Sequence, residues 1–419
     1  MSVRVTLDLP LGHTATGAQT STVGEPSVAA SWTGYVLTGN WYATSSPDAG
    51  ASWRFVNPYT QFPPAAGGFC CDQVVRYSHE HRLWVWLLQY QERDGSNIAR
   101  VAVSRSGEAG TWRHWDVAPS DVDPGWSRLW FDYPDMALSA EHLWISFNLY
   151  TPTGSWRRAV VMRFPLDEAA ELERSGAGTI SRQSWSTGAH GSLRFVTGAH
   201  DTMWWASTTS AAGRLTVFAW EDASPDIRSW LVEVSPWDDR DYTSLGPGGA
   251  PWLSRVDDRI TGGWRLPAQD SSPRAPARLG WLWTSGRRAG RPHPFIRAVT
   301  LAEDDLRVLA EPDLWSTSAA WAYPAAAPSG RGRIGLAACF GGGASHPALV
   351  VGMLDEVVGS WSTTRVATST HGPSQGKWGD YLTVQPHPRR PTSLVAAGFT
   401  LQGGSDRTNV EPRVVVFRD

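Results

Sequence analysis

Short apolar stretches about the length of a β-strand, each followed by turn residues, recur along the whole chain. The first group of four reads GEPSVAASW, GYVLTGNW, YATSSPDAG and ASWRFVNP, and similar groups follow it. Apolar and polar positions that alternate between clusters of Gly, Pro, Asn and Asp predict strands and tight turns. A helix is predicted only for LDEAAELERSG (166–176), which ends in a glycine suited to a C-cap. The chain is therefore expected to be almost entirely β.

The groups behave as repeats of one four-stranded unit, which predicts an all-β fold with a single β-propeller domain over residues 1–419. The last unit is one strand short, and VRVTLDL near the N-terminus alternates suitably to supply the missing outer strand. Seven blades closed by this strand are the prediction. Because residues 251–286 can be divided in two ways, six or eight blades stay as alternatives. The approximate blades are 23–60, 69–118, 130–180, 188–237, 241–315, 321–370, and 378–419 with 1–10.

The composition supports an all-β fold and argues against nucleic acid or a membrane as a partner. The 419 residues include 41 Gly, 29 Pro and 25 Trp, and only 18% are charged. A net charge of −3 provides no basic field for nucleic acid or an anionic membrane. No apolar run reaches the roughly 18 residues of a membrane span, and MSVRVTLDLPLG lacks the pattern of a signal peptide. The sequence as it stands therefore predicts a cytoplasmic protein, or a secreted one if a leader was removed.

Three cysteines are too few for a disulfide framework. Cys70 and Cys71 are adjacent, so they are expected to be buried small residues rather than a bridged pair. An alternative is that both ligate a soft metal together with His190.

One turn carries a family resemblance. SPDAGASW (46–53) closely matches the Asp-box S-x-D-x-G-x-[ST]-W, with Ser46, Asp48, Gly50, Ser52 and Trp53 in place. The chain therefore resembles the sialidase-like (BNR-repeat) propellers. The resemblance implies a turn between the third and fourth strands of a blade, with the aspartate bonded to loop amides and the glycine at positive φ. It also implies that the tryptophan packs between blades and that the turn lies on the face opposite the ligand site.

Sialidase chemistry does not follow from this resemblance. That family uses three arginines around a carboxylate, a tyrosine activated by a glutamate, and an acidic aspartate. Its first arginine lies in an early F/Y-R-I-P phrase, whereas the similar phrase here is WRLP (264–267), far along the chain. Arg265 is therefore interpreted as an ordinary strand arginine, and sialidase activity is not expected.

Related phrases precede several of the repeats: FCCDQVVRYS from Phe69, WFDYPDMALS from Trp130, DRDYTSLGP from Asp239 and WGDYLTVQPHP from Trp378. The innermost strand of each propeller blade begins at one face beside the axis, so these side chains are expected to line one mouth, with Glu25 in the matching position of the first blade. The candidate catalytic residues are Asp72, Asp132, Tyr133, His190, Asp241, Tyr242, Asp380 and Tyr381. The candidate substrate-binding residues are Arg128, Trp130, Arg240, Trp321, Tyr323, His371, Lys377 and Trp378.

Several kinds of chemistry fit such a mouth. A carboxylate could act as an acid or base beside Tyr or His, with aromatic rings stacked on a sugar. No cofactor is assigned, although carboxylates could hold Ca²⁺ or another divalent cation, and each aspartate could simply cap its strand. The leading hypothesis is an enzyme that cleaves a carbohydrate-like or glycosylated substrate by hydrolysis or elimination. The alternatives are a non-catalytic glycan- or protein-binding propeller, and a propeller enzyme of small-molecule metabolism. The oligomeric state is left open.

Overall fold

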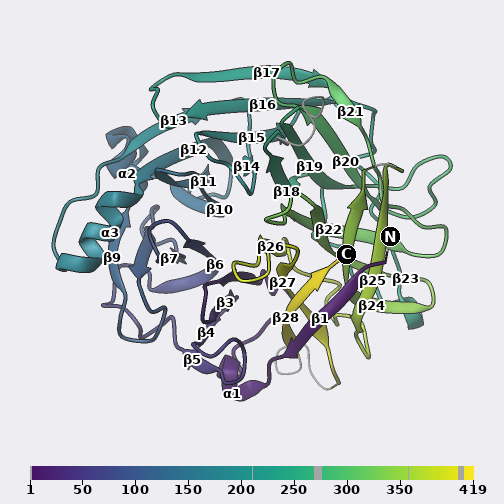
Figure 1. Cartoon of the computed structure of the whole chain (residues 1–419), viewed down its shortest axis with the longest axis horizontal. Helices are drawn as coiled ribbons and strands as arrows, with labels where there is room; N and C mark the ends of the chain where they lie inside the picture. The colour runs from purple at the N-terminus through teal and green to yellow at the C-terminus, as the bar shows by residue number, and fades with distance from the viewer. Residues whose placement is uncertain (1, 210, 269–275, 357, 404–409) are drawn as a thin grey trace.

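The computed structural model describes residues 2–419 except 210, 269–275, 357 and 404–409. Its described part contains seven antiparallel sheets of four strands arranged in a ring, which is a seven-bladed β-propeller (Figure 1). The first blade contains β2 (Ser27–Ala30), β3 (Tyr35–Gly39), β4 (Tyr42–Ser46) and β5 (Arg54–Val56). The second contains β6 (Phe69–Ser78), β7 (Leu83–Tyr90), β8 (Ala99–Ser104) and β9 (Arg113–Val117). The third contains β10 (Trp130–Leu138), β11 (His142–Tyr150), β12 (Trp156–Pro165) and β13 (Gln183–Thr187).

The other four blades continue around the ring in chain order. The fourth contains β14 (Arg194–Phe195), β15 (Thr202–Thr208), β16 (Arg214–Glu221) and β17 (Ile227–Glu233). The fifth contains β18 (Ile260–Leu266), β19 (Arg278–Ser285), β20 (Phe295–Ala302) and β21 (Val308–Ala310). The sixth contains β22 (Ala320–Pro328), β23 (Ile334–Gly342), β24 (Ser345–Asp355) and β25 (Ser360–Thr368). The seventh contains β26 (Thr383–Pro386), β27 (Leu394–Leu401), β28 (Val410–Arg418) and β1 (Arg4–Pro10).

Ring closure by the N-terminal strand is confirmed. β1 pairs antiparallel with β28, from Arg4 opposite Arg418 to Pro10 opposite Arg413. Alternate residues of β1 are exposed and half-buried, so Val5, Leu7 and Leu9 pack inward. This pairing covers the edge of β28, which would otherwise offer unpaired backbone groups to another chain.

Helical segments are few and short. The predicted helix is confirmed as α3 (Leu166–Ser175), and it ends at Gly176 with φ +72°. The others are α1 (His13–Thr16), α2 (Pro119–Val122) and the 3₁₀ turns η1 (Pro124–Trp126) and η2 (Pro247–Gly249). In the described part of the chain no helix is long and apolar enough to span a membrane.

The start of the fifth blade differs from the prediction. Its inner strand begins at Ile260, whereas the sequence interpretation began this blade near Asp241. Residues 234–259 form a long connection instead, because TSLGPGG (243–249) is rich in turn residues and lacks a strand alternation. The first strand after it with a suitable pattern is ITGGWRL.

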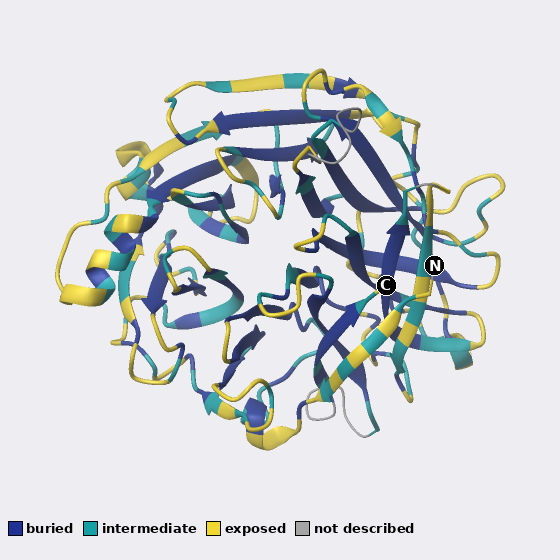
Figure 2. Ribbon diagram, in the orientation of Figure 1, coloured by how far each residue is buried: buried dark blue, intermediate teal, exposed yellow. Residues whose placement is uncertain are grey.

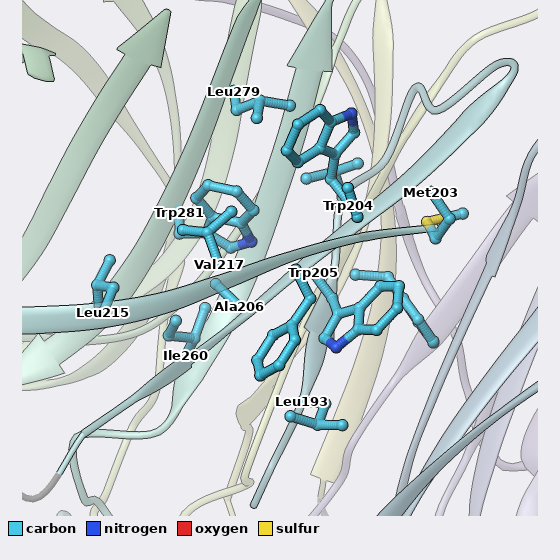
Figure 3. Packing of buried hydrophobic residues seen from close by; sticks show 14 of the residues in the cluster. Leu193, Met203, Trp204, Trp205, Ala206, Leu215, Val217, Ile260, Leu279 and Trp281 are labelled. Atoms are coloured by element: carbon cyan, nitrogen blue, oxygen red, sulfur yellow. The ribbon is translucent and has the colours of Figure 1, made fainter. Parts of the chain in front are cut away.

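The core lies between blades, and tryptophan dominates it. Eight of the twelve largest fully buried side chains among the described residues are Trp. The cluster around Trp204, Trp205 and Trp281 joins the fourth and fifth blades (Figure 3). Figure 2 shows the same division across the ring, with inner and middle strands buried and outer strands such as β17 and β1 partly exposed. Interlocked rings of this size fix each blade against the next.

The Asp-box sequence forms the turn between β4 and β5. Asp48 accepts hydrogen bonds from the backbone N–H of Ser52 (2.8 Å) and from its hydroxyl (2.6 Å). Gly50 has φ +95°, and Trp53 stacks on Tyr35 with 6.2 Å between ring centroids. The contacts of Asp48 and the positive φ of Gly50 are those that the resemblance implies, whereas the ring partner of Trp53 belongs to β3 of the same blade. Membership of the repeat family stays a prediction.

Candidate axial site

The inner strands carry irregularities at the same level, near the face where they begin. The pairing register shifts between Phe69 and Gln73 in β6 and between Asp132 and Asp135 in β10. It also shifts in β18 and β22. Such bulges re-aim side chains, and here the extra residues lie beside the propeller axis.

Three non-glycine residues at this level have a left-handed backbone. Glu25, Tyr133 and Tyr323 have φ values of +42°, +53° and +55°. This conformation is unfavourable for side chains with a Cβ, by about 1–3 kcal/mol each, and it persists where the surroundings enforce it. Strained positions from three blades at one end of the axis point to a functional site there. We call the group formed by Glu25, Asp72, Asp132 and Asp380 the axial carboxyl cluster.

Glu25 and Asp72 form a hydrogen-bonded carboxyl pair. Glu25 is only 2% exposed and also accepts a hydrogen bond from the amide of Asn40 (2.8 Å). Burial, followed by the charges of Asp72 and Asp380, raises the pKa of Glu25 well above its usual value. Burial also raises the pKa of Asp72, to about 7. Two carboxyl groups in such contact hold one proton between them near neutral pH.

The other two carboxyl groups have different partners. Asp132 accepts a hydrogen bond from the side-chain amide of Gln89 (2.9 Å), and burial is the main cause that raises its pKa. Asp380 is 6% exposed and receives two hydrogen bonds from Arg255, at 3.0 Å from Nε and 2.5 Å from Nη2. This bidentate contact holds a guanidinium charge against the carboxyl group of Asp380. The axial carboxyl cluster therefore combines the Glu25–Asp72 pair with an arginine-bound carboxyl group.

Tyrosines lie beside the cluster. The rings of Tyr133 and Tyr381 meet edge to face, with 6.2 Å between centroids. Burial raises the pKa of Tyr133, Tyr323 and Tyr381, so their hydroxyls are protonated. The hydroxyl oxygens of Tyr323 and Tyr381 are buried and make no hydrogen bond with the described residues.

Arginines enclose the same tyrosines. The Arg259 guanidinium lies 4.2 Å from the centroid of the Tyr133 ring. Arg194 lies 5.6 Å from that ring and 5.7 Å from the ring of Tyr381. It is paired with Asp135 at 2.8 Å.

Trp130 marks the rim beside Asp132. Its ring packs against Tyr150 with 5.4 Å between centroids, and its indole N–H donates to the carbonyl of Thr151 (2.9 Å). Trp130 is half-buried and Arg128 is exposed, so both are available to a ligand. The ring pair offers an apolar face next to the carboxyl groups.

The structure brings Asp72, Asp132, Tyr133, Asp380 and Tyr381 together, with Tyr323 beside them. Their roles in catalysis stay predictions.

The predicted roles of Trp321 and Trp378 as ligand-stacking rings are wrong, because both rings are in the core. Trp321 is 6% exposed and packs on Phe340. Trp378 is fully buried, stacks on Phe399 at 4.5 Å, and its N–H contacts the sulfur of Cys339.

The prediction that Arg240, Asp241 and Tyr242 precede an inner strand is also wrong. They lie in the long connection before β18, where Asp241 binds Arg287 (2.6 Å) and Arg240 binds Asp238 (3.3 Å). Asp241 is only half-buried, and the hydrogen bond from the backbone of Thr243 is the main cause that lowers its pKa.

The two candidate histidines and the lysine lie outside the cluster in the described contacts. His190 packs against Phe218, with 5.5 Å between ring centroids, and burial lowers its pKa. His371 contacts the hydroxyl of Thr370 through Nδ1 (3.1 Å), and Lys377 is exposed. A role in ligand binding stays a prediction for all three.

Arg255 and Arg259 are the residues that the sequence interpretation missed. They belong to SRVDDR (254–259), which stands directly before β18, where the DY phrases stand in other blades. Arg265, in contrast, pairs with Glu303 at 2.8 Å, as expected of an ordinary strand arginine.

Cys70 and Cys71 form a disulfide, which corrects the expectation of two buried small residues. Both lie half-exposed in the bulged start of β6, directly before Asp72. Neither sulfur is then a thiolate, so the alternative of a soft-metal site with His190 is wrong as well.

The side chains best placed to bind a divalent cation do not lie at the axial mouth. Among the described residues, the group of three metal-ligand side chains within 4.8 Å of one another is Glu141, His142 and Asp222. Glu141 and His142 lie where β10 turns into β11, and Asp222 directly follows β16, so the group is on the opposite face from the axial carboxyl cluster. A divalent cation at the mouth stays a hypothesis for metal analysis.

Comparisons with known proteins add likenesses at low identity. No protein-family model and no curated protein matches the chain. Among solved structures, the α-L-arabinofuranosidase Arb93A from Fusarium graminearum is 10% identical over 99% of this chain and 98% of its own, with a TM-score of 0.43. A subtype N10 neuraminidase-like protein of A/little yellow-shouldered bat/Guatemala is 10% identical over 80% and 96%, with a TM-score of 0.41. An apocarotenoid oxygenase from Synechocystis is 8% identical over 82% and 72%, with a TM-score of 0.42. At such identities and TM-scores these likenesses carry no argument about activity.

Proposed function

We propose that this propeller is an enzyme that cleaves a glycosidic bond in a carbohydrate-like or glycosylated substrate at the axial mouth. The observation that carries the proposal is the axial carboxyl cluster, in which four acidic side chains from different blades meet and burial raises the pKa values of Glu25, Asp72 and Asp132. A buried carboxyl group with a raised pKa can act as the acid in the cleavage of such bonds, beside a second carboxyl group.

The protonated pair is the proposed acid. Glu25 and Asp72 share a proton near neutral pH, and Asp72 lies partly exposed toward the mouth. In this proposal the pair gives its proton to the leaving oxygen of the substrate. Asp132, which Gln89 orients, is the proposed partner carboxylate that activates water or removes a proton. The tyrosine hydroxyls and the guanidinium of Arg259 are donors for substrate oxygens.

A sugar suits the rim better than a fully apolar ligand. The Trp130–Tyr150 pair can pack against the C–H face of a sugar ring, while the neighbouring hydroxyl and guanidinium donors match its oxygens.

The test is turnover on a panel of oligosaccharides and aryl glycosides, with products identified by mass spectrometry. Wild-type protein should release product, and D72N and E25Q should each lower kcat by about 10²–10⁴-fold with little change in ligand affinity. W130A should raise KM with a smaller effect on kcat. The matched control is D226N, which removes an exposed carboxylate of the fourth blade. Glycan binding without any product from the wild type would contradict the proposal and favour the binding-module alternative.

A further inference from the structure

A buried arginine without a carboxylate partner lies below the axial carboxyl cluster. Arg76 follows Asp72 on β6 by four residues, which is about 13 Å along an extended strand. It is 9% exposed, and its Nη1 donates to the carbonyl of Val75 (2.9 Å) and toward the hydroxyl of Ser27 (3.4 Å). In the described part of the chain it forms no ion pair.

A small cavity adjoins this guanidinium on the propeller axis. Its volume is about 30 Å³, and its walls come from the inner strands of six blades, β6, β10, β14, β18, β22 and β26. Figure 1 shows these strands grouped around the centre of the ring. The volume is enough for about one water molecule or one monatomic ion.

The charges around the cavity do not balance. Its lining includes the guanidinium groups of Arg76 and Arg194 and the carboxylate of Asp135. Asp135 is already bound by Nη1 of Arg194 (2.8 Å) and the backbone N–H of Phe195 (2.9 Å). Burial is the main cause that lowers the pKa of Arg76, to about 10, so this guanidinium is still charged near neutral pH. One positive charge is therefore left over, and an isolated buried charge is strongly unfavourable.

A further donor and an access route complete the site. Gln385 lines the cavity, and its side-chain amide makes no hydrogen bond with the described residues. The cavity shares Arg76, Ala137, Thr197 and Gln385 with a wider depression of about 250 Å³, through which an ion can reach it from the face where β6 ends.

We propose that the axial cavity binds one monovalent, monatomic anion, such as chloride, through the guanidinium of Arg76 and the amide of Gln385. The anion compensates the buried charge and occupies space between the inner strands. Because it binds the folded chain alone, it stabilises the propeller in proportion to its occupancy. Polyatomic anions such as sulfate are too large for the cavity. This site is independent of the proposed catalytic function, and either can fail without the other.

Bromide replaces chloride in such sites and can be located by anomalous scattering. Crystals of the full chain soaked in sodium bromide should give an anomalous peak in contact with Arg76 on the axis. Thermal unfolding supplies the solution measurement. Sodium chloride should raise the Tm of wild-type protein saturably, by about 1–2 °C, relative to sodium gluconate at equal ionic strength.

Two variants separate site binding from general salt effects. R76Q removes the charge and should abolish both the bromide peak and the chloride-specific shift. R54Q removes an exposed arginine of β5 and should leave both unchanged. If R76Q does not fold, the bromide map of the wild type decides alone. Bromide bound only at the protein surface, or an equal chloride shift in R76Q and wild type, would overturn the proposal.

Discussion

Replacing Asp72 by asparagine should stabilise the folded protein at alkaline pH. Burial raises the pKa of Asp72 from 3.8 to about 7, against the hydrogen bond with Glu25, which lowers it. The folded protein therefore binds this proton more tightly than the unfolded chain does. The contribution of Asp72 favours folding at acidic pH and is lost as the pH rises through about 7. Above that pH an ionised carboxylate is held in a site that disfavours it.

The magnitude follows from the two pKa values. The pKa values of Asp72 in the folded and unfolded chain differ by about three. Because a pKa difference of one corresponds to about 1.4 kcal/mol, the effect on the unfolding free energy is at most about 4 kcal/mol. The substitution also weakens the hydrogen bond with Glu25, and this loss offsets about 1 kcal/mol of the gain in stability. We expect D72N to exceed wild type by about 2–3 kcal/mol at about pH 9, and to show no gain at about pH 4.

Urea unfolding at the two pH values measures this difference directly. D226N, the exposed control, should change the unfolding free energy little at either pH. A D72N protein that is destabilised equally at acidic and alkaline pH would contradict a raised pKa of Asp72, because this residue would then be an ordinary ionised, hydrogen-bonded carboxylate.

Four further outcomes test the fold and the site. D135N should lower the unfolding free energy by about 3–5 kcal/mol in urea, because it leaves the guanidinium of Arg194 buried and uncompensated; a loss under about 1 kcal/mol would contradict a dry ion pair. W378A should also lower the unfolding free energy by about 3–5 kcal/mol in the same assay, because the ring of Trp378 is fully buried. A neutral effect would place this ring in solvent. Gly50→Ala should lower the unfolding free energy by about 1–2 kcal/mol, because φ at this position is +95° and the new Cβ would lie 2.4 Å from a methyl group of Leu9. An unchanged Tm would contradict this turn geometry. Deletion of residues 1–10 should expose β28 and produce aggregates in size-exclusion chromatography, whereas a stable monomer would show that ring closure is dispensable.

Blade repetition was readable from the sequence because each strand alternates apolar and polar residues between turn residues. The missing strand of the seventh blade pointed to VRVTLDL for the same reason. The fifth blade was misplaced because DRDYTSLGP imitates the phrase before other inner strands, although it lies in a long connection. A local phrase does not reveal whether a strand follows it or a turn-rich segment intervenes.

The axial carboxyl cluster was partly predictable for a similar reason. Residues at equal positions in the repeats meet at one end of the axis, so Asp72, Asp132 and Asp380 could be grouped in advance. The direction of a side chain could not be read in this way. Trp378 stands two positions before Asp380, yet its ring enters the core between blades, where it stacks on Phe399. Packing across blades decides such orientations, and the sequence pattern carries little information about it.

The most direct test of the central claim is infrared difference spectroscopy of carboxyl groups during a pH titration. If Glu25 and Asp72 share a proton, the wild type shows the carbonyl stretch of a protonated carboxylic acid at neutral pH, and this band is lost or shifted in both E25Q and D72N. A spectrum without such a band at neutral pH, or with a band that neither substitution affects, would contradict a shared proton at the axial mouth.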